Sequence, residues 1–185
     1  MIGVLVSGEG TNLQALLDVG LPVRAVASNV ARARALERAR RAHVPTGVFE
    51  LDDYATRADR DDAMADWLAE HGVEVVVCAG YMHLLTPAFL ARFPVLNVHP
   101  SLLPAFPGMR AVEEALAAGV RETGVTVHLV DEGVDTGPVL AQEAVPVGPE
   151  DTPETLRARL HAVEHRLLPE TTRRFLARPL RSPAQ

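Results

Sequence analysis

The chain has 185 residues, 48% of them hydrophobic and 23% charged, with a formal net charge of −6 and a pI near 5.6. Such a length and composition predict one globular domain over residues 1–185, and the acidic balance argues against a nucleic-acid partner. All 18 basic residues are arginine, which excludes a Schiff-base lysine and a Walker A lysine. Anionic ligands must therefore be bound by arginine, histidine, backbone amides or helix ends.

No hydrophobic run approaches the roughly 18 residues that a membrane span requires, and residues 1–5 resemble a strand rather than a secretion signal. The single cysteine, Cys78, lies within the run Val75-Val-Val-Cys-Ala79, which predicts a reduced thiol in the core. We therefore expect a cytoplasmic protein, either monomer or homodimer, that binds no membrane.

Hydrophobic patterning predicts strands that alternate with helices along most of the chain. A strand over 2–6 is followed by a glycine turn and by a helix that opens at Thr11 and Asn12. The further expected strands are 23–27, 48–51, 73–79 and 95–98, and the further helices are 31–42, 57–70, 86–90 and 111–118. The stretches 125–131 and 139–147 alternate in polarity and predict antiparallel strands, 151–175 predicts a long helix, and 176–185 a frayed tail. The expected fold class is α/β, a single domain with a mostly parallel Rossmann-like sheet flanked by helices and late antiparallel strands.

The most informative segment is Asn97-Val-His-Pro-Ser-Leu-Leu-Pro104, in which Asn97 and His99 lie at the end of a predicted strand. Residues two apart on an extended backbone project to the same side, and the two prolines stiffen the turn that follows. An amide and an imidazole so placed suit hydrogen-bond donation to one small oxygen, and a carboxylate from elsewhere would keep the imidazole protonated. Asp135, flanked by Gly133 and Gly137, is the candidate carboxylate, and the pattern indicates acyl-type transfer through a tetrahedral oxyanion.

The glycine turn Gly8-Glu-Gly-Thr-Asn-Leu13 departs from the dinucleotide-binding fingerprint, because Leu13 stands where its third glycine would be. The second strand also ends at Ser28-Asn29, without an acidic residue for a ribose diol, so NAD binding is not expected. The turn still offers free amides at a helix N-terminus, which suits one phosphate, and helix capping by Thr11 or Asn12 is the alternative.

Two other patterns suggest chemistry that we do not expect. His161-Ala-Val-Glu-His165 matches the H-x-x-E-H pattern of one zinc peptidase class, but no third ligand stands out, so we predict no metal. The acidic pairs Asp52-Asp53, Asp61-Asp62 and Glu113-Glu114 lie at expected helix starts, so we interpret them as capping and surface charge.

At this point the chain resembles the folate-dependent glycinamide ribonucleotide formyltransferases of purine biosynthesis. The similarity covers nearly the whole chain, and its motifs are the loop Val4–Gln14, Val77–Met82, Asn97–Pro104, Phe106–Gly108, Gly124–His128 and Asp131–Pro138. The Asn-x-His-Pro-Ser-x-Leu-Pro motif is shared with other formyl-folate enzymes. The Ser-Gly-x-Gly-Thr-Asn-Leu loop is what favours the ribonucleotide enzymes.

The resemblance implies a role for residues in each of three groups. His99 would be the acid, Asp135 would raise its pKa, and Asn97 would donate to the oxyanion. Glycinamide ribonucleotide would be bound by Gly10, Thr11, Asn12, His161, Ala162, Val163 and Glu164. The co-substrate 10-formyltetrahydrofolate would be bordered by Arg57, Met82, His83, Leu84, Leu85, Asn97, Asp131, Glu132, Gly133, Val134 and Asp135.

Two other activities fit the same residues. A 10-formyltetrahydrofolate hydrolase would use the same three catalytic groups with water, but water needs no phosphate loop such as Thr11-Asn12. A non-catalytic module that binds a nucleotide phosphate would keep the polar cluster for structural reasons only.

Overall fold

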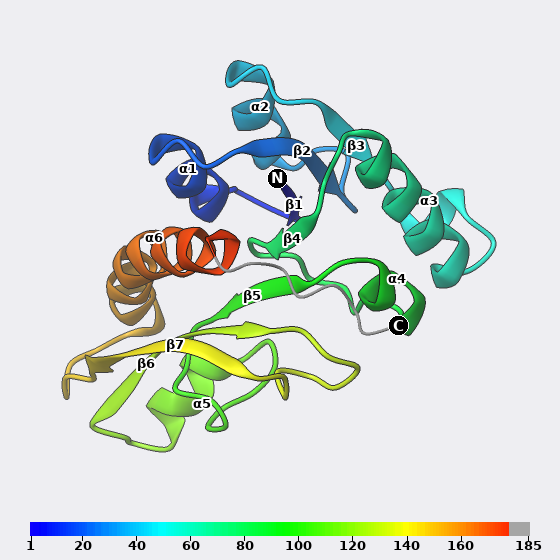
Figure 1. The fold of residues 1–185 in the computed structure, drawn as a ribbon. Helices are drawn as coiled ribbons and strands as arrows, with labels where there is room; N and C mark the ends of the chain where they lie inside the picture. Colours follow the sequence, from blue (N-terminus) through cyan, green and yellow to red (C-terminus); the bar gives the residue numbers. More distant parts are fainter. Residues whose placement is uncertain (178–185) are drawn as a thin grey trace.

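The computed structural model describes residues 1–177, and these form one seven-stranded sheet covered by helices (Figure 1). The strands are β1 (Ile2–Val6), β2 (Val23–Ser28), β3 (Thr46–Val48), β4 (Val75–Cys78), β5 (Val95–His99), β6 (Glu122–Leu129) and β7 (Val139–Pro146). The helices are α1 (Thr11–Asp18), α2 (Arg34–Arg41), α3 (Arg57–Glu70), α4 (Pro87–Arg92), α5 (Ala111–Ala117) and α6 (Pro153–Leu176), and Leu51–Asp53 form a 3₁₀ turn.

The strand order is β3-β2-β1-β4-β5-β6-β7. The first five of these strands run parallel, whereas β6 pairs antiparallel with β5 and β7 antiparallel with β6. The predicted mostly parallel sheet with late antiparallel strands is therefore confirmed. The order reverses between β1 and β4, and open α/β sheets bind their ligands at such a point.

Two hydrophobic clusters cover the two faces of the sheet. One face packs against α1, α2, α5 and α6, through side chains such as Leu16, Leu36 and Leu160. The other packs against α3 and α4, through Leu68 and Phe89. Strand β4 is buried along its whole length, as its β-branched run Val75–Val77 predicts for a strand with helices on both faces. Cys78 is free and buried, as predicted.

Three details differ from the sequence-based expectations. The third strand is Thr46–Val48 rather than 48–51, because Leu51–Asp53 turn in a 3₁₀ helix. The last helix includes Leu176, so the expected frayed tail does not begin there, and 178–185 lie outside the described residues. Asp61, expected at the surface, is fully buried, because Arg60 beside it is buried too and forms an ion pair with it.

Within residues 1–177, none of the helices combines the length and the hydrophobicity that crossing a membrane would require.

Leu160→Ala tests whether α6 is a structural part of the sheet layer. Leu160 is fully buried against the cluster on that face, so we expect its truncation to lower the free energy of unfolding by about 2–5 kcal/mol. Urea denaturation followed by circular dichroism measures the change. Val139→Ala on the exposed edge strand serves as the control, expected within about 0.5 kcal/mol of wild type. Equal effects of the two substitutions would contradict the packing described here.

Candidate active site

The carboxyl ends of three neighbouring parallel strands bring the candidate residues together. In the pairing register Leu5 of β1 lies beside Cys78 of β4, and Cys78 lies beside Asn97 of β5. The chain leaves all three strands at the same edge of the sheet, since parallel strands end on the same side. The glycine turn, the 79–85 segment and the Pro100–Arg110 loop therefore meet there.

Asn97 and His99 project from β5 on one face of the sheet, where β6 is the neighbouring strand. The antiparallel register places Asn97 opposite His128 and His99 opposite Thr126. The Asn97 amide Nδ2 lies 3.2 Å from His128 Nε2 and 3.5 Å from Asp135 Oδ1. Residues spaced by two on β5 thus share one face, as the sequence predicts, and that face carries the polar cluster.

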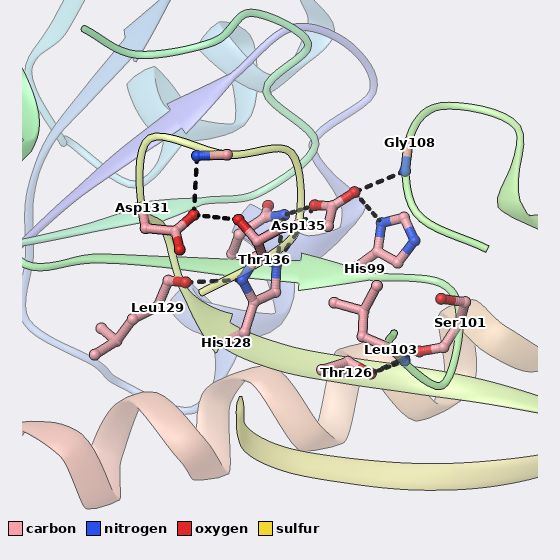
Figure 2. Close-up of polar contacts among 12 residues, drawn as sticks. His99, Ser101, Leu103, Gly108, Thr126, His128, Leu129, Asp131, Asp135 and Thr136 are labelled. Atoms are coloured by element: carbon pink, nitrogen blue, oxygen red, sulfur yellow. Dashed lines mark hydrogen bonds and ion pairs between the residues drawn. The ribbon is translucent and has the colours of Figure 1, made fainter. Parts of the chain in front are cut away.

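Asp135 joins three segments of this cluster, as Figure 2 shows. Its Oδ2 accepts a hydrogen bond of 2.8 Å from the backbone N–H of Gly108 and lies 3.3 Å from His99 Nδ1. Its Oδ1 lies 3.5 Å from His128 Nε2. Asp135 has a φ of 54°, in the left-handed region, which aspartate and asparagine adopt more readily than other non-glycine residues.

Opposing influences act on the Asp135 carboxyl group. Burial raises its pKa, but the His128 hydrogen bond, the Gly108 N–H and the positive charges of His99 and His128 together outweigh that effect. The net result is a pKa below the ordinary value of an aspartate. Asp135 is therefore an anion at neutral pH and lies beside His99 in that form.

Both ring nitrogens of His99 face hydrogen-bond acceptors. Nε2 lies 2.8 Å from the carbonyl oxygen of Phe106, and Nδ1 lies at the ion-pair distance from Asp135. A carbonyl and a carboxylate accept only, so an imidazolium, which carries a hydrogen on each nitrogen, satisfies both partners. Phe106 itself has a φ of 52°, so the backbone that presents this carbonyl is strained.

His128 is a site residue that the sequence analysis did not single out. Its Nδ1 lies 2.8 Å from the Leu129 carbonyl oxygen, so Nδ1 carries a hydrogen, and its Nε2, 3.5 Å from Asp135 Oδ1, lies 3.2 Å from Asn97 Nδ2. This contact orients the Asn97 amide. The alternating stretch 125–131 placed His128 on a shared face with Thr126, but only the β5–β6 register puts it opposite Asn97.

The loop after β5 is fastened to β6 and β7 by hydrogen bonds. Thr126 Oγ1 donates to the Ser101 carbonyl at 2.6 Å and accepts from the Leu103 N–H at 3.1 Å. Gln142 Nε2 donates to the Leu103 carbonyl at 2.8 Å and to the same Thr126 hydroxyl at 2.9 Å. The start of the turn that leads to Phe106 and Gly108 is thus anchored to β6 and β7.

A cavity of about 420 Å³ opens over this cluster. Asn97, His99 and Asp135 line it, together with all of Met82–Leu85 and all of Asp131–Asp135. Met82, Leu84 and Val134 expose hydrophobic surface there, and hydrophobic lining is typical of small-molecule sites. Arg57, the first residue of α3, is exposed and is not among the residues that line the cavity.

A second cavity of about 490 Å³ adjoins the first, since Gly80, Met82, Val98, Pro100 and Met109 line both. Gly10, Thr11, Asn12, His161 and Glu164 line this second cavity, whereas Ala162 and Val163 do not. Positions 161 and 164 are three apart on α6 and share one side of the helix, while the two between them point elsewhere.

The second cavity includes the N-terminus of α1. Gly10 precedes the helix with a φ of 72°, and a Cβ there would lie 2.5 Å from the Ala35 Cβ, so both conformation and space require glycine. Neither Thr11 nor Asn12 caps α1 by a side-chain hydrogen bond, which is contrary to the capping alternative. The first N–H groups of the helix have no intrahelical partner and suit an anion.

Asn12 and Glu164 form a buried polar pair at this cavity. Asn12 Nδ2 donates to Glu164 Oε2 at 2.7 Å, and both side chains are more than nine-tenths buried. Asn12 Oδ1 is buried and has no hydrogen-bond partner among the described residues. A buried polar atom without a partner is costly, so a hydrogen-bond donor on a ligand in this cavity would stabilise it.

Ser7 connects the glycine turn to the 79–85 segment. Its hydroxyl donates to Asn29 Oδ1 at 2.6 Å and accepts from the Met82 N–H at 2.9 Å. Asn29 stands at the end of β2, where a dinucleotide-binding fold needs an acidic residue, and here its side chain serves to hold Ser7.

The H-x-x-E-H pattern does not form a metal site. His161 and His165 stack with ring centroids 6.1 Å apart, and Glu164 bonds to Asn12. Within residues 1–177, no group of three or more histidine, cysteine or acidic side chains is placed to bind a metal ion.

Known proteins share both the sequence and the fold. The family described as formyl transferase matches residues 1–172. The phosphoribosylglycinamide formyltransferase of Haemophilus influenzae is 40% identical over 188 residues, covering 97% of this chain and 89% of the relative. That of Mycobacterium tuberculosis is 50% identical over 171 residues, covering 89% and 80%.

A longer relative and a solved structure extend the comparison. The chain is 44% identical over 182 residues to the trifunctional purine biosynthetic protein adenosine-3 of Chironomus tentans, and the match spans 93% of this chain and 13% of that protein. The crystal structure of glycinamide ribonucleotide transformylase 1 from Symbiobacterium toebii superposes with a TM-score of 0.92 at 49% identity, covering 94% of this chain and 86% of that one. The chain therefore belongs to the formyl transferase family.

Proposed function

We propose that this protein transfers the formyl group of 10-formyltetrahydrofolate to the amine of glycinamide ribonucleotide. The products are N-formylglycinamide ribonucleotide and tetrahydrofolate, and the reaction is a step of purine biosynthesis. The relatives that carry the name phosphoribosylglycinamide formyltransferase support this activity. The observation that carries the proposal is the pair of adjoining cavities, with Asn97 and His99 on the strand whose end both cavities share.

The polar cluster suits the chemistry of formyl transfer. The neutral amine adds to the formyl carbon, and negative charge develops on the formyl oxygen. Asn97 Nδ2–H and the imidazolium of His99 stabilise that oxyanion, as preorganised donors do in acyl transfer. A ring N–H of His99 reaches the oxyanion only by leaving its partner in the free protein, which is Asp135 for Nδ1 and the Phe106 carbonyl for Nε2.

Collapse of the tetrahedral intermediate breaks the bond between the formyl carbon and N10 of the folate. The attacking nitrogen loses a proton and N10 gains one, so the overall step is balanced with no other reactant. His99 supplies and recovers the proton as a general acid and base, and the Asp135 anion stabilises its charged form. Asp135 is thus assigned an electrostatic role.

The two substrates are assigned to the two cavities by their chemistry. The ribonucleotide phosphate is bound by the amides at the start of α1 with Thr11, and Asn12, His161 and Glu164 contact the rest of that substrate. Formyl-folate lies against Met82–Leu85 and Asp131–Asp135, where the exposed hydrophobic side chains receive its ring. Arg57 contacts the folate from outside the cavity lining.

The same activity implies where the protein acts and which kinds of partner it binds. The protein acts on small molecules in the cytoplasm, as a monomer or homodimer, and binds neither nucleic acid nor membranes. The net charge of −6 supports the part of this proposal that concerns nucleic acid. Residues 1–185 act as one domain, which the sheet that contains all seven strands supports.

Turnover of 10-formyltetrahydrofolate, followed spectrophotometrically with and without glycinamide ribonucleotide, tests the activity. We expect turnover only when the ribonucleotide is present, and we expect His99→Ala to lower kcat by roughly 10²- to 10⁴-fold. Release of formate without the acceptor would instead indicate a hydrolase. Phosphate-dependent ligand binding without any turnover would indicate a binding module. A His99→Ala variant that keeps a tenth or more of the wild-type kcat would contradict the assignment of His99 as the acid.

Asp135→Asn tests the electrostatic role through its pH dependence. The carboxyl pKa lies below its ordinary value in the folded protein, so its ionised form stabilises the fold. That stabilisation is complete above the unfolded pKa of about 3.9 and is lost as pH falls through the lower folded pKa. We therefore expect the free energy of unfolding of wild type to exceed that of Asp135→Asn at pH 6, and the difference to shrink in acid. A difference that grows as pH falls would contradict this assignment.

Asn12→Asp tests the ribonucleotide cavity. It places a second carboxylate where the amide donates to Glu164 at 2.7 Å, so the donor is lost and two anions repel each other. We expect the KM for the ribonucleotide to rise by more than about tenfold, with little change in the KM for formyl-folate. Gln14→Glu adds the same charge elsewhere on α1 and serves as the control. Equal increases in both KM values would mean that Asn12 does not belong to a separate ribonucleotide site.

A further inference from the structure

Arg60 is the largest fully buried side chain of the described residues. It lies near the start of α3 and contacts the 79–85 segment, which borders the cavity of about 420 Å³. A guanidinium ion is always charged at physiological pH, and its transfer out of water is costly unless acceptors surround it. The acceptors around Arg60 therefore show what this side chain holds in place.

Arg60 has two such acceptors. Its Nε and Nη2 lie 2.8 and 2.7 Å from Oδ1 of Asp61, whose other oxygen accepts a 2.8 Å hydrogen bond from the Thr86 N–H. On the far side of the guanidinium, Nη1 lies 2.8 Å from Nδ1 of His83. Arg60 thus links the first turns of α3 to the segment that contains His83.

The chemistry of the guanidinium determines the protonation of His83. Arginine only donates hydrogen bonds, so the Nδ1 atom that faces Nη1 must accept with its lone pair. A neutral imidazole with its lone pair on Nδ1 carries its hydrogen on Nε2. This tautomer leaves Nε2–H as the donor of His83, and Nε2 has no hydrogen-bond partner within residues 1–177.

The groups around His83 favour the same neutral form. Burial and then the positive charge of Arg60 lower the pKa of His83, and Arg57 adds to the decrease, while the Asp61 carboxylate opposes it. The Tyr81 ring meets the imidazole edge-on with centroids 6.0 Å apart and carries no charge, because burial raises the pKa of its hydroxyl. His83 lines the cavity that we assign to formyl-folate.

We propose that Arg60 is a positioning residue for formyl-folate binding, which holds His83 as a neutral imidazole whose Nε2–H donates to an oxygen acceptor of the bound folate. The identity of the ligand in this proposal rests on the function proposed above, whereas the tautomer of His83 is a property of the protein without ligand. Arg60 does not line either cavity, so it acts on the ligand through His83.

Nitrogen-15 NMR of the histidine rings tests the tautomer without any substrate. We expect the His83 Nδ1 of the free wild-type protein to show the shift of an unprotonated nitrogen and Nε2 that of a protonated one. The signals are assigned by their loss in His83→Asn. In Arg60→Met we expect a mixture of the two tautomers. A wild-type ring with Nδ1 protonated would overturn the proposal, whether or not the protein is a formyltransferase.

Kinetics with formyl-folate and the ribonucleotide test the link to binding. Asn at position 83 keeps an oxygen that accepts from Arg60 but lacks the Nε2 donor. We expect His83→Asn and Arg60→Met each to raise the KM for formyl-folate by roughly three- to tenfold, the effect of one hydrogen bond, with kcat within about twofold of wild type. Because Arg60 acts through His83, the double variant is expected to resemble His83→Asn alone.

Arg92→Met is the matched control, because it removes another cation of the α3–α4 layer that pairs with Asp66 and does not touch His83. Its KM for formyl-folate is expected to match wild type. Additive effects in the double variant, or a loss of kcat with unchanged KM, would overturn the positioning role. If Arg60→Met does not fold, two results still decide against the proposal: a wild-type His83 ring with Nδ1 protonated, or an unchanged KM for formyl-folate in His83→Asn.

Discussion

The carboxylate of Asp135 connects parts of the chain that are far apart in sequence. One oxygen accepts from Gly108 and faces His99, and the other faces His128. The loop after β5, the end of β5 and strand β6 are thereby held around one anion. The contacts of His99 and the orientation of Asn97 both depend on this arrangement.

The sheet topology makes that arrangement available. Five parallel strands end at one edge, so loops from distant parts of the chain meet there. The antiparallel pairing of β6 with β5 adds a face that a purely parallel sheet would lack, and it sets His128 opposite Asn97. The mixed sheet is therefore a requirement of the polar cluster, since both of its strands supply side chains.

The two cavities are organised differently although they share five lining residues. The one beside α1 contains the start of a helix and a buried amide oxygen that has no hydrogen-bond partner within residues 1–177. The other is bordered by exposed hydrophobic side chains and by a buried guanidinium behind His83. In the proposed function, these differences separate a phosphate-bearing substrate from a substrate with a flat ring, and the two cavities adjoin at the end of β5.

Local sequence patterns were sufficient for the order of strands and helices, the late antiparallel pair, and the gathering of Asn97 and His99 on one face. Periodicity and short motifs encode these features, because they depend on neighbours a few residues away. Tertiary structure decided four other features. These are the burial of Asp61, the role of His128, the contacts of Arg60 with His83, and the orientation of Ala162 and Val163 away from the cavity beside α1. Each depends on which distant segment packs against the residue, and register and burial arise only when the whole sheet is assembled.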